Sequence, residues 1–555
     1  MKKLLTLLFC SLFFGANSQI IFEHVSKSSI YDFIDEMAGI KLIEVNSAVK
    51  PYSRKFIAEK LQEIQTKQDK LNKRQKKELA FFLRDYRKEL GLNNQIDWLG
   101  KKVFGKNSIP FKSREKRVDL FYYKDSLFNF TLNPIVGMKV WYNQNGLTYH
   151  RWNGGELLGY IGKSLGIYVN LRDNYTTSDI YGSNYLVQEM GGRFKGATAG
   201  FTNTKAKEFS ELRGGLVYSW KWGYLGILKE HNVWGNGYNG SNILSSRSPS
   251  YAQIKLNLKP TKWLEMQYFH GWLSSMVVDS NRTQNYGTGP SEVYVPKFLA
   301  MNMFTIKPIK NLYLNIGNSI VYSNNINAGY MIPFIFFKSL DHTYSSLGNS
   351  AMFFDLSIRN LKKCHFYFSA FIDELSIGRM FNKQLQSNFW SLKGGVQVIN
   401  LIPNTTLTAE YTRTNPITYK HYNPETTFES TNYNLGYYLR DNSQNLYLKV
   451  AYKPLPRLQI AAFYDYASKG PDYADDRTQI NPTTGRTYVL GLPFQESLIW
   501  ESTTIGGSIN YEVLNDIHIR LGANYSNVWD PTGKYTPKAF SGKQITTTAT
   551  VSWGF

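Results

Sequence analysis

The densest group of residues suited to ligand chemistry lies in one glycine-rich stretch. It reads Trp234-Gly235-Asn236-Gly237-Tyr238-Asn239-Gly240-Ser241-Asn242. Glycines allow positive φ angles and close approach of the backbone, while aromatic rings and asparagine amides can stack on sugar rings and hydrogen-bond to them. Two interpretations stay open: a folded loop that constricts the lumen of a larger fold, or a sugar-contacting surface. The ligand-binding candidates from this stretch are Trp234, Gly235, Asn236, Gly237, Tyr238 and Asn239.

The same stretch contains the spacing G-x-G-x-x-G, which is typical of dinucleotide-binding folds. That function needs a helix directly after the glycines, so that a phosphate can lie at the helix N-terminus. Here residues 243–249 are rich in serine, end in a proline and lead into another candidate strand. The pattern therefore argues against nucleotide binding, and no cofactor is predicted.

Catalytic motifs are weak in this sequence. The eight histidines form no H-E-x-x-H motif and no i, i+4 pair, and no G-x-S-x-G motif occurs. Asp341 and His342 are adjacent in the chain, and adjacent residues of a strand face opposite ways. We therefore interpret them as polar residues of a loop and not as a catalytic pair. Glu230 and His231 precede the glycine-rich stretch and are predicted to form an inward polar network that supports it. We expect a protein that is not an enzyme and holds no metal.

Two arginines are further candidates for ligand binding. Arg151 lies within Tyr149-His150-Arg151-Trp152, and Arg247 follows the glycine-rich stretch. An arginine beside aromatic rings can pair with the uronate or phosphate group of an acidic sugar. The competing interpretation is that aromatic residues at strand ends form the interfacial girdles of a membrane barrel. The formal net charge of +22 favours a polyanionic partner in either case.

The elements that must position these residues are strands, and the last one has the clearest pattern. In residues 545–555 apolar side chains alternate strictly with polar ones, which predicts a strand with one apolar and one polar face. Its length suits a tilted transmembrane strand, and an aromatic final residue is typical of outer-membrane barrels. An edge strand of a soluble sandwich is the alternative at this point.

The rest of the chain favours the barrel. Aromatic residues reach 15% although the mean hydropathy is −0.35, a combination expected of strands with one lipid face and one wet face. Short turns alternate with long connections rich in Asn, Ser, Gly and Pro. We predict a closed antiparallel outer-membrane β-barrel of about 16–18 strands. Candidate strands are residues 117–124, 128–142, 214–228, 252–258, 263–272, 298–306, 312–322, 353–358, 366–372, 389–399, 406–412, 433–440, 446–452, 458–466, 504–511 and 517–525.

Three regions are expected along the chain. Residues 1–18 have the basic start, apolar centre and small-residue end of a signal peptide. Residues 19–112 are predicted to form a periplasmic helical domain, with Ser53 as a helix N-cap. Its basic stripe (Lys70, Lys73, Arg74, Lys76 and Lys77) is predicted to be a solvated face. Residues 113–555 are predicted to form the transmembrane barrel. Export of the chain argues against a nucleic-acid partner.

The sequence resembles a known family over nearly the whole chain after the signal peptide, and most specifically in the loop at residues 234–245. Residues 223–245, from Gly223-Tyr224-Leu225-Gly226 through the glycine-rich stretch to Leu244-Ser245, are similar to the Wzi family of capsule-assembly proteins. In that family a strand leads into a W-G-x-G-Y-x-G-S loop, followed by a segment rich in Leu and Ser and then a proline. Asn236 stands where the family pattern would have a proline.

The resemblance implies a function. Wzi-like proteins are outer-membrane barrels of Gram-negative bacteria that hold capsular or other surface polysaccharide at the cell exterior as lectins. The expected partners are therefore such a polysaccharide, outer-membrane lipid, and a periplasmic or peptidoglycan contact through the helical domain. The alternatives are a porin or polysaccharide-conducting channel and a gliding or adhesion component of the outer membrane.

Overall fold

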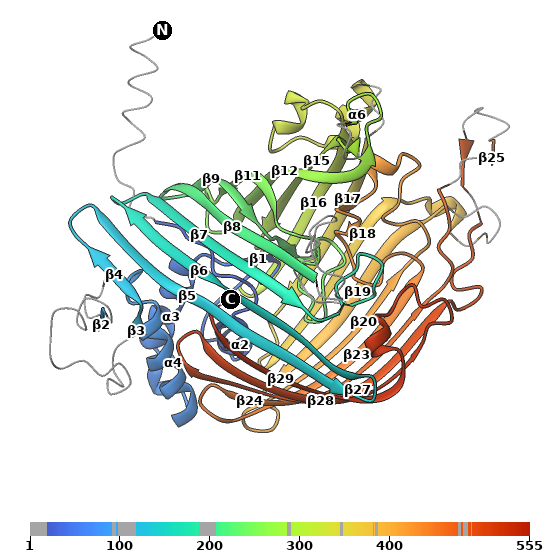
Figure 1. Cartoon of the computed structure of the whole chain (residues 1–555). Coiled ribbons are helices and arrows are strands. Elements are labelled where there is room, and N and C mark those ends of the chain that lie inside the picture. Colours follow the sequence, from blue (N-terminus) through green and yellow to red (C-terminus); the bar gives the residue numbers. More distant parts are fainter. Residues whose placement is uncertain are drawn as a thin grey trace, which may run out of the picture.

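The computed structural model describes most of the chain and shows a barrel with helices at one end (Figure 1). The described residues are 19–91, 96–97, 118–178, 180–187, 207–285, 290–344, 348–380, 382, 387–475, 479–480, 487–489 and 491–554. The predicted signal peptide lies outside them. No helix among the described residues is long and apolar enough to cross a membrane.

Within the described residues, 18 antiparallel strands close the barrel, as the sequence predicts. They are β5 (Phe128–Asn143), β6 (Gly146–Ile161), β7 (Leu165–Thr176), β8 (Lys207–Trp220), β9 (Gly223–Glu230), β11 (Tyr251–Leu258), β12 (Leu264–Val278), β15 (Tyr294–Ile306), β16 (Leu312–Ser323), β17 (Asn349–Ile358), β18 (Cys364–Glu374), β19 (Phe389–Ile399), β20 (Thr405–Thr414), β23 (Ser443–Leu455), β24 (Leu458–Lys469), β27 (Trp500–Leu514), β28 (Ile517–Trp529) and β29 (Gly542–Trp553). Pairing of β29 with β5 completes the ring, and β4 (Phe121–Lys124) lies beside the start of β5.

The side chains of β29 explain why this sequence forms a membrane barrel. Ile545 and Val551 point outward and are 65% and 59% exposed, whereas Thr546 and Ser552 point inward and are buried. An apolar exterior can face lipid, and the closed ring pairs the backbone groups of every strand, which a bilayer requires. The predicted alternation is confirmed, and the soluble-sandwich alternative is not what the chain forms.

Two predicted strands are wrong. Residues 214–228 form no single strand but a hairpin, because the chain turns at Lys221–Trp222 between β8 and β9. Residues 433–440 contribute only the two-residue strand β22 (Tyr433–Asn434), which pairs with β21 (Glu429–Ser430) inside a long connection. With residues 433–440 removed from the wall, β20 pairs directly with β23 and the strands alternate in direction throughout this part of the barrel.

Three α-helices precede the barrel, within the region 19–112 that the sequence predicts to be helical. They are α2 (Ser28–Gly39), α3 (Arg54–Gln65) and α4 (Lys73–Asp85). The Ser53 side chain accepts a hydrogen bond from the Phe56 amide, so the predicted N-cap is confirmed. Arg74, in contrast, is not part of a solvated face: its guanidinium is buried between Glu36 and Glu78.

The remaining elements are short. They are α6 (Phe337–Tyr344), β1 (Val49–Lys50), β2 (Ile96–Asp97), β3 (Val118–Asp119), β10 (Val233–Trp234), β13 (Gln284–Asn285), β14 (Pro290–Ser291), β25 (Gln479–Ile480) and β26 (Thr487–Tyr488), with 3₁₀ turns η1 (Gln68–Lys70), η2 (Ala328–Met331), η3 (Ile377–Arg379), η4 (Pro424–Thr426) and η5 (Lys538–Phe540). Most belong to the long connections between strands. In Figure 1 the α6 and β25 segments lie away from the end that holds α2, α3 and α4.

The helices close the end of the barrel that carries the short turns. Arg359, after β17, donates to Asp35 at 2.7 Å, to the Val45 carbonyl at 3.0 Å and to Ser47 at 2.9 Å. Lys27 forms ion pairs with Glu23 at 2.7 Å and with Asp516, between β27 and β28, at 2.9 Å. Short turns face the periplasm in outer-membrane barrels, so this packing agrees with the predicted periplasmic position of the helices, which stays a prediction.

The contact between the helices and the barrel wall should weaken in acid. Burial alone would raise the pKa of Glu36, but Lys453 and Arg74 outweigh it and lower that pKa to about 2. A depressed carboxyl pKa stabilises the fold above the ordinary value near 4.5, and that stability is lost as the pH falls towards 2. The loss amounts to about 3 kcal/mol. Glu36→Gln should remove this pH dependence and lower stability at pH 7, as measured by thermal unfolding in detergent between pH 7 and pH 2.5.

The matched control for this prediction is Glu59→Gln, because Glu59 is an exposed residue of α3. Its unfolding temperature should follow that of the unsubstituted protein over the whole pH range. An acid-induced loss of stability in the Glu36→Gln protein as large as in the parent would contradict the assignment.

Candidate functional site

The glycine-rich stretch folds into the lumen as a crosspiece, which we define as residues 231–245. It begins where β9 ends, and its strand β10 pairs with β1 of the N-terminal segment, Val49 opposite Trp234 and Lys50 opposite Val233. The Gly235 amide donates to the Ala48 carbonyl at 2.8 Å. Gly235 has a φ of +115°, which an L side chain would strain. The loop from one mouth of the barrel thus meets the segment from the other mouth inside it.

Trp234 anchors the crosspiece to the wall beside it. Its side chain is fully buried, and the ring meets those of Phe269 and Phe353 edge-on at centroid distances of 5.3 and 5.9 Å. Such edge-to-face packing adds to the stabilisation that a large buried aromatic side chain provides. In this structure Trp234 is a packing residue, with no exposed face for a ligand.

The tip of the crosspiece is bonded to the opposite wall. Asn236 donates from its backbone amide to Asp355 at 3.1 Å, and the Tyr238 hydroxyl lies 2.9 Å from His365 Nδ1. The backbone amides of Tyr238 and Asn239 donate to Glu410 at 2.5 and 2.8 Å. Glu410 also accepts from Lys393 Nζ at 2.9 Å, and neither of these charged side chains is exposed. Buried charges need such partners, so the crosspiece is held in one position.

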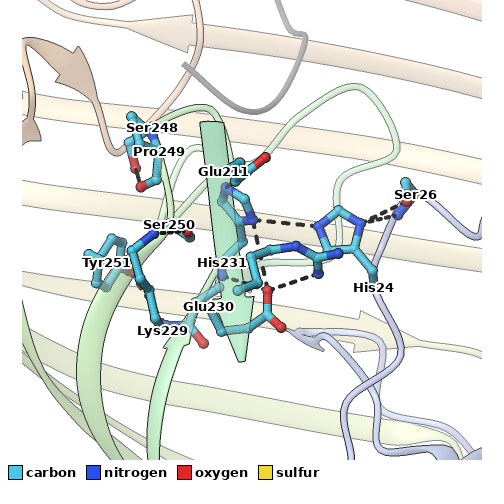
Figure 2. A network of polar contacts seen from close by, with 12 residues as sticks. His24, Ser26, Glu211, Lys229, Glu230, His231, Ser248, Pro249, Ser250 and Tyr251 are labelled. Atoms are coloured by element: carbon cyan, nitrogen blue, oxygen red, sulfur yellow. Dashed lines mark hydrogen bonds and ion pairs between the residues drawn. The ribbon is translucent and has the colours of Figure 1, made fainter. Parts of the chain in front are cut away.

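A polar network fixes the base of the crosspiece (Figure 2). His24, from the N-terminal segment, lies 3.5 Å from His231, and His231 lies 3.2 Å from Glu211. Glu230 accepts from the His231 amide at 2.9 Å and pairs with Arg213 at 3.3 Å. Burial lowers the pKa of His24 well below its ordinary value, and Arg213 lowers it further. The predicted inward network around Glu230 and His231 is present.

Within the described residues, His24, Glu230 and His231 are the one group with the spacing of a metal site. Both rings have other partners, however: His24 Nδ1 is 2.7 Å from Ser26 Oγ, and His231 Nε2 is next to Glu211. The Arg213 guanidinium already supplies a cation beside Glu230. We assign this group as a set of hydrogen-bonded contacts that join the N-terminal segment to the barrel.

A second long connection packs against the crosspiece from the long-loop end. Tyr419 donates to the Asn242 carbonyl at 2.6 Å, and the Ser245 amide donates to the Leu435 carbonyl at 2.6 Å. Tyr437 is fully buried and donates to Asn445 on the wall at 2.8 Å. The N-terminal segment, the crosspiece and residues 415–442 are thus joined inside the barrel and obstruct its lumen.

The two candidate arginines lie in different surroundings. Arg151 is exposed on the outward side of β6 and stacks over Tyr175 at 4.8 Å, as expected for the interfacial girdle. Arg247 is 2% exposed; it donates to the Val187 carbonyl at 2.9 Å and lies 5.3 Å from the Tyr433 ring. Arg247 belongs to the loop packing next to the crosspiece, whereas Arg151 points away from the lumen. Ligand binding by these eight residues stays a prediction.

The structure adds a cleft that the sequence did not indicate. It holds about 470 Å³ between the walls of β5, β24, β27, β28 and β29 and the loops above them, a size typical of ligand pockets. Its lining is rich in aromatic rings and also contains Lys139 and Asp465. The rings are those of Trp141, Tyr181, Tyr438, Phe463, Trp500, Tyr535 and Phe540.

The cleft is built around a few fixed contacts. Lys139 lies 4.4 Å over the Trp141 ring, whose other neighbour is Phe540 at 6.1 Å. Asp465 accepts from Asn239 at 3.3 Å, so the crosspiece supports the floor of the cleft. Trp141 and Tyr438 each stand beside a tyrosine in the sequence. The other rings come from strands and loops that are far apart in the chain.

The closed ring of amphipathic strands defines an outer-membrane β-barrel protein, located in the outer membrane of a Gram-negative bacterium. Among solved structures, Wzi of Escherichia coli matches with a TM-score of 0.54 and 12% identity, over 97% of this chain and 100% of that one. Wzi is described as a carbohydrate-binding β-barrel involved in group 1 capsule assembly. The likeness shows that this chain has the Wzi fold.

Porin-like barrels are also similar to this chain, at lower scores. OccAB2 of Acinetobacter baumannii matches with a TM-score of 0.42 and 9% identity, over 78% of this chain and 99% of that one. OpdK of Pseudomonas aeruginosa matches with a TM-score of 0.40 and 8% identity, over 76% and 98%. No protein-family model and no curated protein matches the sequence.

Removing the carboxylate that holds the crosspiece should destabilise the protein. Glu410→Ala leaves Lys393 and the donors of the crosspiece without their acceptor, which costs about 3–5 kcal/mol. Glu410→Gln keeps acceptor oxygen in place and should lose less. Unfolding in detergent, followed by circular dichroism, measures both. Tyr411→Ala is the matched control, because Tyr411 is the next residue and points outward, 46% exposed; equal losses in all three variants would contradict this role of Glu410.

A filled lumen should not conduct ions. In planar bilayers the protein should show no steady single-channel current, because the N-terminal segment, the crosspiece and residues 415–442 obstruct the path. The control is a variant without residues 236–241, joined by two glycines; it loosens the crosspiece and should show current fluctuations. Stable open channels in the unsubstituted protein would contradict the obstruction.

Proposed function

We propose that this protein binds acidic surface polysaccharide at the cell exterior and retains it on the cell, as a lectin-like barrel in capsule assembly. The observation that carries the proposal is the aromatic cleft on the long-loop side of a filled barrel. Long loops of outer-membrane barrels face the exterior. A glycan that enters this cleft can be held, and it has no described path through the lumen.

The chemistry of the cleft suits sugars. Aromatic rings such as Trp141 and Phe540 offer flat apolar faces to the C–H faces of sugar rings, and Lys139 can pair with a carboxylate or phosphate. The formal net charge of +22 adds long-range attraction for an acidic polymer. Wzi, which shares the fold, is itself described as carbohydrate-binding. Binding should therefore weaken with rising salt.

The alternatives receive less support. A porin or polysaccharide channel needs an open lumen, which the crosspiece and the N-terminal segment oppose. Catalysis is also not part of the proposal, because Glu230 and His231 belong to the polar network that fixes the base of the crosspiece. No contact in the described residues favours a gliding or adhesion role over glycan retention.

The test compares polysaccharide fractions from cells of the native host. Deleting the gene should leave total synthesis unchanged and move the cell-bound polysaccharide into the medium. The double variant Lys139→Gln/Phe540→Ala should restore little of the cell-bound fraction, because it removes the cation and one ring of the cleft. Tyr142→Ala should restore it fully, since Tyr142 follows Trp141 but points outward, 63% exposed. Unchanged fractions in the deletion strain would disprove glycan retention.

A further inference from the structure

A second and larger cavity lies at the opposite end of the barrel, beside the helices. It holds about 850 Å³. One side is formed by residues 44–60, which include the start of α3, and the other by the rim turns after β8, β11 and β15. Tyr224, Asn257 and Gln267 contribute inward-facing side chains of the wall. The cavity therefore lies inside the barrel rim and not on its lipid-facing side.

The lining of this cavity is basic. Six lysines face three glutamates, and neither aspartate nor arginine takes part. The lysines are Lys55, Lys60, Lys221, Lys259, Lys262 and Lys307, and the glutamates are Glu44, Glu59 and Glu265. Lys307 pairs with Glu44 at 2.5 Å and Lys259 lies 3.9 Å from Glu265. Lys55 lies 3.9 Å from Glu59, and Lys60 pairs at 2.9 Å with Glu63 just outside the lining. Two positive charges, those of Lys221 and Lys262, remain in excess, and a recess with low-dielectric walls concentrates anions at such charges.

Aromatic rings alternate with these lysines. Trp220 and Trp222 meet edge-on at a centroid distance of 5.4 Å, and Trp222 and Trp263 are 50% and 54% exposed. Across the cavity, Tyr52 and Phe56 lie 5.1 Å apart. Flat rings next to cations suit a ligand that has both apolar C–H faces and negative charge.

A buried polar atom of the lining points to a ligand that carries hydroxyl groups. Gln267 Oε1 has no hydrogen-bond partner among the described residues, and leaving such an acceptor unsatisfied is unfavourable. A sugar hydroxyl can donate a hydrogen bond to it.

From this cavity we infer a second glycan-binding site, which takes a short anionic sugar segment from the periplasmic side. The inference rests on the proposed function for the class of ligand but assigns a different place of contact. Lysines bind the carboxylate or phosphate groups, and the tryptophan rings stack on the sugars. Because the crosspiece and the N-terminal segment lie between the two sites, we expect each site to bind its own length of chain.

The experiment uses the full-length protein in detergent, with tetragalacturonate as the anionic probe and maltotetraose as the neutral one. Isothermal titration should show tighter binding of tetragalacturonate, weakening as salt rises. Lys221→Gln/Lys262→Gln should lower that affinity about fivefold, since each exposed ion pair contributes modestly. Both lysines are exposed on rim turns, so the fold should tolerate the change. Lys77→Gln/Lys362→Gln, which alters two exposed lysines outside the lining, should bind as the parent does.

The outcomes separate this site from the outer cleft. Unchanged tetragalacturonate affinity in Lys221→Gln/Lys262→Gln would overturn the inference. If Phe540→Ala alone then abolished binding, the proposed function would stand and the second site would not. Loss of affinity in the lysine variant, with no effect of the outer-cleft variants on binding or retention, would support the inference and disprove the proposed function. Co-sedimentation with purified peptidoglycan, compared with the host's acidic surface polysaccharide, identifies the source of the segment.

Discussion

The structure depends on one small piece of sheet inside the lumen, where β1 pairs with β10. Val49 lies opposite Trp234 and Lys50 opposite Val233, so a segment that enters from the short-turn mouth is joined to a loop that enters from the other mouth. Backbone pairing satisfies polar groups that burial would otherwise leave unpaired. The barrel is thereby obstructed by two segments that support each other, and the wall alone would leave an open pore.

Buried charges determine where these segments rest. Glu410 accepts from two crosspiece amides, from Lys393 and from Tyr367 at 2.6 Å. Asp355 holds Asn236 in a similar way. A buried ion pair contributes little net stability compared with an apolar pair, but it penalises every arrangement that leaves one charge alone. These carboxylates therefore select one position for the crosspiece. The crosspiece in turn donates a hydrogen bond from Asn239 to Asp465, which lies in the floor of the outer cleft.

The wall of the barrel could be predicted from the sequence because its physics is local. Alternation along residues 545–553 reports directly which side chains face lipid. The hairpin at Trp220-Lys221-Trp222-Gly223 is hard to predict because its two central residues, Lys221 and Trp222, are not the glycine, proline or asparagine that usually signal a turn, and Gly223 stands alone beside them. Residues 433–440 were mistaken for a strand because their aromatic and aliphatic side chains are typical of strands, although here they pack inside the lumen.

The candidate site could not be predicted in the same way, because its contacts are distant in the chain. Asn236 and Asp355 are 119 residues apart, and His24 and His231 are 207 apart. The glycine-rich stretch was correctly seen as a folded loop or a sugar surface, yet no local pattern could decide between them. What decides its packing is the complementary set of inward polar groups on β17, β18 and β20. The position of the crosspiece has a consequence for the two proposed sites. It lies between the outer cleft and the basic cavity, so a glycan chain threaded through both would have to displace it. The two proposed sites share no lining residue, and substitutions of the basic rim should therefore leave the outer cleft unaltered.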